Sequence, residues 1–374
     1  MTNIPDNWIE TPIKSIAKVI TGKTPSTNIA ENYGKDIPFI TPGDLGNSKH
    51  VHTTERYITY KGAMGLKILP PKTCVFTCIG STIGKVGLTV TESTTNQQLN
   101  AIIANSNISS EFLYYTLAYI APKIKIIAGV QAVPIINKTE FENTKIFIPI
   151  NKTEQRAIAD ILSTWDAAIE KMEKLIEAKE KRFKGLLKEI IENPNNKEIN
   201  TKLGAICIVK KGKQLNKVHM ENSGKYYALN GGIEPSGRTN NWNTEANTIT
   251  ISEGGNSCGF ISYNSERFWS GGHCYALESL NDNIHIDYLY YYLKYFEPKI
   301  MRLRVGSGLP NIQKKDINKF QLDFPKLEEQ INDALKLKLT NKEIEILKEV
   351  VEKYKEQKRG LMQKLLTGEW RVKV

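Results

Sequence analysis

Residues 154–192 read EQRAIADILSTWDAAIEKMEKLIEAKEKRFKGLLKEIIE, and residues 329–366 read EQINDALKLKLTNKEIEILKEVVEKYKEQKRGLMQKLL. The two stretches align at a constant offset of 175 residues, with Glu154-Gln155 matching Glu329-Gln330. Apolar residues recur at alternating spacings of four and three, which is typical of paired helices with charged flanks. Each stretch predicts a helix of roughly 38 residues, about 55–60 Å long.

The apolar seam of each predicted helix is interrupted in places. Lys179 breaks the first seam, and Asp333, Thr340 and Lys358 break the second. Because a long amphipathic helix cannot bury its stripe alone, we expect the twins to pair as an intramolecular antiparallel coiled coil. The residues predicted to pair are Ile158, Leu162, Trp165, Ile169, Met172, Ile176, Phe183, Leu337, Ile344, Leu347, Val351, Tyr354, Leu361 and Leu365.

The duplication extends upstream of the helices at an offset of 176 residues. Phe112-Leu113-Tyr114-Tyr115 matches Tyr288-Leu289-Tyr290-Tyr291, and Pro134 matches Pro310. Each copy is domain-sized, far longer than the repeat unit of a solenoid. A chain with such internal symmetry suits a ligand with a near two-fold axis, and duplex DNA is the commonest of these.

Each copy mixes strand and helix patterns, so we predict an α+β protein with two mixed α/β domains in a pseudo-two-fold arrangement. The expected strands are 37–40 and 73–79 in the first copy, and 226–229 and 248–252 in the second. An aromatic-rich helix is expected from Ser109 or Ser110 to Tyr119, with a twin at 286–296. The predicted segments are 1–150 (first domain), 151–192 (helix), 193–327 (second domain) and 328–374 (helix and tail), with a boundary at Asn193-Pro194-Asn195-Asn196.

The charge lies in the two domains. Residues 1–150 carry 14 basic and 10 acidic side chains, a net charge of +4, and residues 193–327 carry 17 and 12, a net charge of +5. Residues 151–192 carry nine of each, and the whole chain has a net charge of +11. Basic globular domains are consistent with a polyanionic partner, although many lysine-rich proteins bind no nucleic acid.

The composition predicts a cytoplasmic protein. The start of the chain shows no secretory signal, and no run of about 18 apolar residues predicts a membrane span. The five cysteines are odd in number and form no CxxC pair, so we expect reduced thiols and no zinc site. The five histidines also lack metal-ligand spacing, and no metal site is predicted.

No catalytic motif stands out. Gly22-Lys23-Thr24 resembles the end of a phosphate-binding loop, but Ala17 stands where its first glycine is required. Gly80-Ser81-Thr82-Ile83-Gly84-Lys85 has three residues between its glycines where the motif has four. A methyltransferase would need an Asn/Asp-Pro-Pro-aromatic tetrapeptide, and Asn193-Pro194-Asn195 does not match it. A basic, duplicated chain without catalytic residues is predicted to be a binding protein.

Polar loops that recur in both copies are the predicted DNA-binding sites. Amide side chains recognise adenine, and Arg or Lys recognises guanine or binds phosphate. Asn96-Gln97-Gln98 is aligned with Gly272-His273-Cys274, and Gln131 with Ser307. The candidates are Lys23, Thr41, Asp44, Ser81, Thr82, Lys85, Asn96, Gln97, Gln98, Gln131 and Lys138 in the first copy, and Lys213, Asn230, Asn256, Ser257, His273, Arg302, Arg304, Ser307 and Lys314 in the second. Any one of them is more simply explained as a solvated turn or a capping residue, and the prediction rests on the loops as a group.

The chain resembles the specificity (S) subunits of type I restriction–modification systems. The resemblance rests on Asn7-Trp8 with Val19–Pro25 at the start, on Ile148-Pro149 before Glu154-Gln155, and on the closing run Lys358–Arg371. One stretch departs from it, because Gln214-Leu215 stands in the second copy where Thr24-Pro25 stands in the first.

The resemblance implies two target recognition domains, each reading one half of a bipartite, asymmetric DNA site. It implies that the helices set the spacer between the half-sites and dock two methyltransferase (M) subunits, which methylate adenine N6. S-adenosylmethionine would be bound by those subunits, and ATP and Mg by partner restriction (R) subunits that cleave DNA. The chain itself would be non-catalytic and bind no cofactor.

Two other functions are compatible with parts of the sequence. The heptads alone also fit a structural adaptor whose coiled coil joins protein partners. A lone endonuclease or methyltransferase is disfavoured by the missing motifs.

Overall fold

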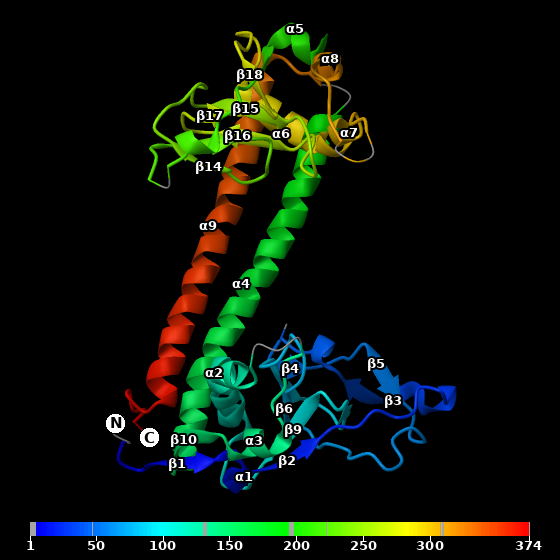
Figure 1. The fold of residues 1–374 in the computed structure, drawn as a ribbon, viewed down its shortest axis with the longest axis vertical. Coiled ribbons are helices and arrows are strands. Elements are labelled where there is room, and N and C mark those ends of the chain that lie inside the picture. Colours follow the sequence, from blue (N-terminus) through cyan, green and yellow to red (C-terminus); the bar gives the residue numbers. More distant parts are fainter. Residues whose placement is uncertain are drawn as a thin grey trace. The chain divides into compact units, whose positions relative to one another are not determined.

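The computed structural model describes residues 5–46, 48–129, 133–193, 198–221, 223–306, 308 and 310–373. The chain divides into unit 1, formed by Met1–Met172 with Val350–Val374, and unit 2, formed by Glu173–Glu349. Both long helices, α4 (Lys152–Glu192) and α9 (Leu327–Leu366), contribute one part to each unit (Figure 1). Because this division cuts through both helices, the predicted domain boundaries at 150, 193 and 328 stay predictions.

Unit 1 is built on a main sheet in the order β2-β9-β6-β7-β4, with a smaller sheet in the order β5-β3-β8 and the antiparallel pair β1-β10. Its core strands β6 and β7 are buried along their whole length. The strands are β1 (Trp8–Pro12), β2 (Ala17–Thr21), β3 (Tyr33–Ile40), β4 (His50–Val51), β5 (Arg56–Ile58), β6 (Cys74–Thr77), β7 (Val86–Thr89), β8 (Thr94–Thr95), β9 (Leu99–Ala104) and β10 (Lys145–Pro149).

The helices of unit 1 are α1 (Ile13–Ile16), α2 (Ser110–Ile127) and α3 (Lys138–Asn143). The predicted start of α2 is confirmed, because the Ser109 hydroxyl accepts a hydrogen bond from the backbone N–H of Phe112 at 3.4 Å. The helix continues past the predicted end at Tyr119, since buried Ala121 and Ile124 extend its apolar face. It packs beside α4, where the Tyr115 hydroxyl donates to Asp166 at 2.5 Å.

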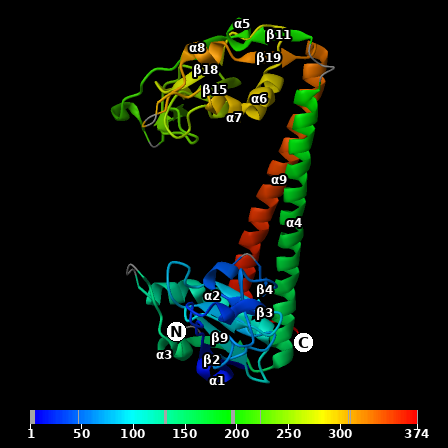
Figure 2. The same cartoon turned by 90° about the vertical axis from the view of Figure 1, so that its right-hand side faces the viewer.

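Unit 2 repeats this plan. Its main sheet has the order β12-β18-β15-β16, with a smaller sheet β14-β13-β17. The antiparallel pair β11-β19 completes it (Figure 2). The strands are β11 (Ile199–Lys202), β12 (Ile208–Lys211), β13 (Tyr226–Leu229), β14 (Gly237–Thr239), β15 (Thr248–Ser252), β16 (Ile261–Asn264), β17 (Trp269–Ser270), β18 (Cys274–Glu278) and β19 (Gln321–Phe324). The helices are α5 (Leu203–Ile206), α6 (Ile286–Tyr295), α7 (Glu297–Met301) and α8 (Lys314–Asn318). The predicted mixed α/β fold with two long helices is confirmed.

A buried glutamine lies in the first turn of each long helix. In unit 1 the Gln155 amide oxygen accepts from the backbone N–H of Ser109 at 2.8 Å, and its amide nitrogen donates to the carbonyl of Pro149 at 2.9 Å. In unit 2 Gln330 does the same with His285 at 2.8 Å and Pro325 at 2.9 Å. The repeated Glu-Gln motif therefore ties the end of a strand, the start of the aromatic helix and the start of the long helix together.

All residues predicted to pair between the helices are at least half-buried. Some also belong to the domain cores: Ile158, Leu162 and Leu365 pack in the core of unit 1, and Leu337 in that of unit 2. The buried members are Ile158, Leu162, Ile169, Leu337, Ile344, Val351 and Leu365, and the half-buried ones are Trp165, Met172, Ile176, Phe183, Leu347, Tyr354 and Leu361.

Two of the interruptions in the seam form ion pairs between the helices. In unit 2 Lys179 lies 2.7 Å from Glu343, and in unit 1 Lys358 pairs with Asp166. Close by in unit 1, the ring of Trp165 meets that of Tyr354 edge-on, with centroids 5.5 Å apart. Residues early in α4 thus meet residues late in α9, and residues late in α4 meet earlier ones, so the helices run antiparallel.

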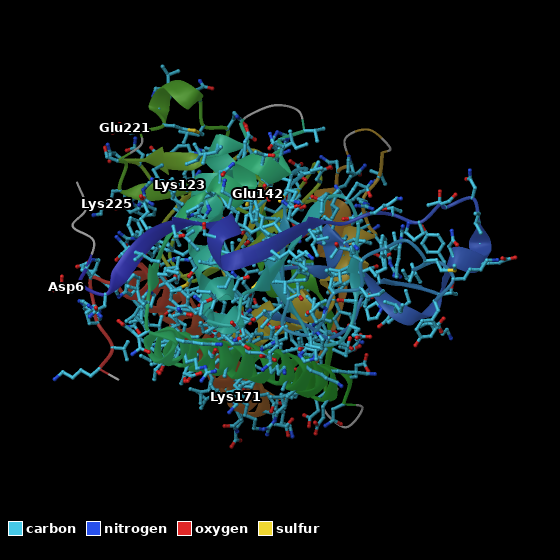
Figure 3. The ribbon with its side chains drawn as sticks, turned by 90° about the horizontal axis from the view of Figure 1, so that it is seen from below. Asp6, Lys123, Glu142, Lys171, Glu221 and Lys225 are labelled. Carbon is cyan, nitrogen blue, oxygen red and sulfur yellow. The ribbon has the colours of Figure 1, made fainter. Side chains whose placement is uncertain are left out.

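The C-terminal tail closes onto the start of unit 1 (Figure 3, near Asp6). Arg371 binds both carboxylate oxygens of the buried Glu154, at 2.8 and 3.1 Å, and donates to the carbonyl of Asp6 at 2.8 Å. The indole N–H of Trp8 donates to the same carboxylate at 3.3 Å. Gly368 lies against Trp8, in the left-handed region with φ +74°, so a side chain there would strain the backbone and meet the indole.

We predict that Arg371→Met lowers the free energy of unfolding by about 1–3 kcal/mol, because it leaves the buried Glu154 carboxylate with an unsatisfied oxygen. Arg359→Met is the matched control, since Arg359 is exposed and its partner Glu356 is 4.0 Å away. The control is expected to stay within about 0.5 kcal/mol of the unchanged chain. Denaturant unfolding measures both, and equal effects of the two substitutions would contradict the prediction.

Candidate nucleic-acid interface

Loops distant in the sequence meet at one edge of the main sheet in unit 1. The backbone N–H of Lys23 donates to Thr95 at 2.9 Å, and that of Asn96 donates to Ile40 at 3.1 Å. The backbone N–H of Gly80 donates to Pro134 at 2.9 Å. We call residues 22–24, 41–46, 78–85, 95–98 and 133–136 loop cluster 1, with residue 47 outside the described part.

Unit 2 forms the same network at corresponding positions. The backbone N–H of Lys213 donates to Ser270 at 2.9 Å, and that of Gly271 donates to Leu229 at 2.7 Å. The N–H of Gly255 donates to Pro310 at 3.0 Å. We call the described residues among 211–214, 229–232, 252–260, 270–275 and 302–312 loop cluster 2. The two copies therefore share a backbone framework at this edge.

In each cluster a glycine allows two backbone segments to lie very close together. A Cβ atom on Gly22 would lie 2.1 Å from the carbonyl oxygen of Asn96, and one on Gly212 would lie 2.2 Å from that of Gly271. No side chain fits at these distances, so the Gly-Lys turn of each copy can lie against the neighbouring loop only because it has glycine.

One sequence alignment is corrected by the hydrogen bonds. The N–H of Cys78 donates to Gln98, and the N–H of Glu253 donates to His273, so Gln98 corresponds to His273 and Asn96 to Gly271. The alignment of Asn96-Gln97-Gln98 with Gly272-His273-Cys274 is therefore wrong by one residue. The reason is an extra residue after β18, near Ser279, whose φ of +53° marks an irregular backbone.

The first-copy candidates lie around loop cluster 1 and differ in their exposure and hydrogen bonds. Thr41 and Asp44 bond to each other in a capping box, and the amide of buried Asn96 donates to Gln98 at 2.9 Å. The exposed candidates are Lys23, Ser81, Gln97 and Lys138, and the half-buried ones are Thr41, Asp44, Thr82, Lys85 and Gln98. Lys138 begins α3, just beyond the cluster.

In the second copy the exposed candidates are mostly basic. They are Lys213, Asn256, His273, Arg302, Arg304 and Lys314, while Asn230 and Ser257 are half-buried. Ser257 donates to the carbonyl of Gly231 at 2.5 Å, which turns its hydroxyl inward. Lys314 begins α8, as Lys138 begins α3. Gln131 and Ser307 lie outside the described residues.

A charged network under loop cluster 2 was missed by the sequence analysis. The carboxylate of Glu253, buried at the end of β15, accepts from Lys211 at 2.6 Å and from the Tyr275 hydroxyl at 2.8 Å. Burial alone would raise the pKa of Glu253, but these hydrogen bonds and the charges of Lys211 and His273 outweigh it and lower that pKa. The one sequence signal is an acidic residue directly after a strand of alternating Thr or Ser and Ile, where the first copy has Cys78.

The cysteines are buried thiols in both units, without disulfide bonds. Burial raises the pKa of Cys78 and of Cys207 to about 12, which keeps both protonated and unreactive at neutral pH. Within the described ranges, three or more His, Cys, Asp or Glu side chains do not gather in a group that would hold a metal ion. The helices of the described part are also all too short or too polar to cross a membrane.

A family model described as the type I restriction modification DNA specificity domain matches residues 5–180 and 194–354. This chain belongs to that family. It is 36% identical over 184 residues to the specificity subunit of the MjaIX type I restriction enzyme of Methanocaldococcus jannaschii, covering 48% of this chain and 42% of that one. It is 35% identical over 162 residues to a putative type I specificity subunit of Mycoplasma pneumoniae, covering 43% of each. These alignments span less than half the length of either relative.

A longer match extends over both copies of this specificity-family chain. The MjaVIII specificity subunit of Methanocaldococcus jannaschii is 24% identical over 412 residues, covering 99% of this chain and 94% of that one. The fold is similar to the crystal structure of a type I S subunit from M. genitalium, with a TM-score of 0.69, 22% identity, and coverage of 98% and 97%. A chain from a structural study of assembly in the type I system aligns with a TM-score of 0.64 and 16% identity, covering 98% of this chain and all of the other.

We predict that Glu253 makes stability fall in acid. Its pKa is lowered in the folded state, so its contribution is present above the ordinary carboxyl range, near pH 4.3, and is lost as pH falls through the folded pKa. Glu253→Gln removes this titration, so its free energy of unfolding should decline less between about pH 5 and pH 3. Denaturant unfolding at several pH values measures this, with exposed Glu234→Gln as the control. Parallel curves for the Glu253 variant and the unchanged chain would contradict the prediction.

Proposed function

We propose that this chain is the DNA-recognition subunit of a type I restriction–modification complex, in which each loop cluster reads one half of a bipartite, asymmetric site. The observation that carries the proposal is a shared backbone framework with unlike side chains. The same hydrogen bonds form in both clusters, while Gln98 stands in one where His273 stands in the other. A common scaffold docks two surfaces on the duplex in a similar way, and the different side chains select different bases.

The charge of the two copies supports a DNA partner. Net charges of +4 over residues 1–150 and +5 over residues 193–327 provide attraction to phosphates that does not depend on sequence. Exposed Lys23 and Lys213 occupy the same position in the two clusters, next to the glycine that closes each turn. Their role in the proposal is to bind the DNA backbone and fix the register in which the other loops meet the bases.

The chemistry belongs to partner subunits in this proposal. Two M subunits would bind S-adenosylmethionine and methylate adenine N6, and R subunits would bind ATP and Mg and cleave DNA, within the cytoplasm. The chain itself would be non-catalytic. Its neutral helix, with nine basic and nine acidic side chains in residues 151–192, suits protein docking better than DNA contact. The antiparallel helices would set the spacer between the half-sites.

We expect that exchanging residues 1–150 for those of a related specificity subunit changes one half-site and leaves the other unchanged. The chain is purified with its M subunits, and methylated adenines are mapped in genomic DNA. The unchanged chain should give one split motif. Absence of any split motif, or an unaltered motif after the exchange, would reject the proposal.

We also expect the spacer to follow helix length. One added heptad after Met172 in α4, with a matching heptad after Glu349 in α9, lengthens both helices by about 10 Å. At about 3.4 Å per base pair this is roughly three base pairs, so the mapped spacer should grow by that amount or binding should be lost. A conservative control replaces an exposed residue of α4, Lys171→Arg, without changing its length. An unchanged spacer and affinity after the insertion would argue against this role of the helices.

A further inference from the structure

Only one of the two oxygens of the buried Glu253 carboxylate accepts hydrogen bonds. Its Oε1 atom accepts from Lys211 and Tyr275, whereas Oε2 is buried without a hydrogen-bond partner. Nδ1 of His273 lies 3.6 Å from Oε2. This distance exceeds a hydrogen bond, but a small rotation of the exposed imidazole would close it. The His273 side chain is 61% exposed, so the imidazole is accessible to a ligand at the loop cluster.

The first copy has an uncharged set at the same four positions. Cys78 stands for Glu253, Gln98 for His273, Asn100 for Tyr275 and Thr21 for Lys211, and Thr21 donates to Asn100 at 2.8 Å. The backbone network is the same in both copies, so this fold forms without a charge here. A buried carboxylate is costly unless it is fully paired. The half-paired Glu253 therefore points to a role beyond folding.

The carboxylate determines how the imidazole is protonated. A neutral histidine carries its proton on one ring nitrogen, and a carboxylate beside Nδ1 favours Nδ1–H. Nε2 is then left as an acceptor that faces away from Glu253. In the major groove only adenine N6 and cytosine N4 offer amino hydrogens to such an acceptor.

We propose, on the basis of the proposed function, that His273 reads the amino group of an adenine or cytosine in the half-site of unit 2, and that Glu253 is its positioning residue. Lys211 neutralises the buried charge and fixes which oxygen faces His273. Tyr275 holds the same oxygen from within the core, so the orientation of the carboxylate is set from two sides.

Glu253→Gln tests this by reversing the hydrogen-bond direction. Lys211 has only donors, so the amide oxygen of the variant must take the place of Oε1. The amide NH₂ then faces Nδ1 of His273 and makes that nitrogen an acceptor. Nε2 becomes a donor, and at the position of the amino group it suits guanine O6 in place of adenine N6, or thymine O4 in place of cytosine N4.

The variants are assembled with their M subunits and selected on a pool of random duplexes, and the base frequencies of the bound DNA are read for each half-site. The domain exchange described above shows which half-site belongs to unit 2. We expect adenine or cytosine at one position of that half-site, about a two- to tenfold loss of this preference in His273→Ala, and a shift to guanine or thymine in Glu253→Gln. Glu278→Gln, which removes a carboxylate paired with Lys210 at 2.9 Å on neighbouring strands, is the matched control and should change neither half-site.

Selection of the unit 1 half-site shows that each variant folds and assembles. His273→Gln is a second variant, and it introduces the residue type that unit 1 has at the corresponding position, Gln98. An unaltered unit 2 half-site in both His273 variants overturns the reading role. A loss of preference in Glu253→Gln without the shift to guanine or thymine overturns the positioning role. Failure of the unchanged chain to select any split site would reject the proposed function instead.

Discussion

The fold depends on how each long helix is joined to its domain, and the join is one buried amide. Gln155 and Gln330 each satisfy a donor at the start of the aromatic helix and an acceptor at the end of the last strand. Loss of either bond would leave a buried polar backbone group unpaired, at about 1–3 kcal/mol. A side chain under such constraint cannot vary freely, which explains why Glu-Gln persists in both copies while the loops have diverged.

The elements that follow from local sequence patterns were predictable, whereas the contacts between residues distant in the sequence were not. The heptads of α4, the N-cap at Ser109 and the strands at 226–229 and 248–252 follow from local patterns. The charged seam residues Lys179 and Lys358 appeared as interruptions because their partners lie on the other helix. Lys211 and Tyr275 lie on β12 and β18, and Glu253 directly follows β15, so only the sheet register shows that they meet. Most of the described candidate residues lie in the two loop clusters, and their role in DNA binding stays a prediction. Their hydrogen bonds and the one-residue shift after β18 could be seen only from the backbone.

The comparison of the two loop clusters separates what the scaffold needs from what a ligand needs. Gly22 and Gly212 are required in both, because each backbone passes too close for a side chain. Polar side chains differ at neighbouring positions, with an uncharged Thr21–Asn100 pair in one copy and a Lys211–Glu253 pair in the other. The positions that are the same in both copies are those where the backbone geometry requires one residue type. The positions that differ are those whose polar side chains distinguish the two clusters.

The antiparallel helix pair has a consequence for the order in which the protein forms during synthesis. Unit 1 contains residues 350–374 as well as 1–172, so its core lacks Leu361, Leu365 and Leu366 until residues beyond the end of unit 2 have left the ribosome. Unit 2 is continuous, from 173 to 349, and has all of its residues earlier. Unit 1, most of which is translated before unit 2, is therefore completed after it. Glu154 lacks its hydrogen-bond donor Arg371 while more than two hundred residues are synthesised.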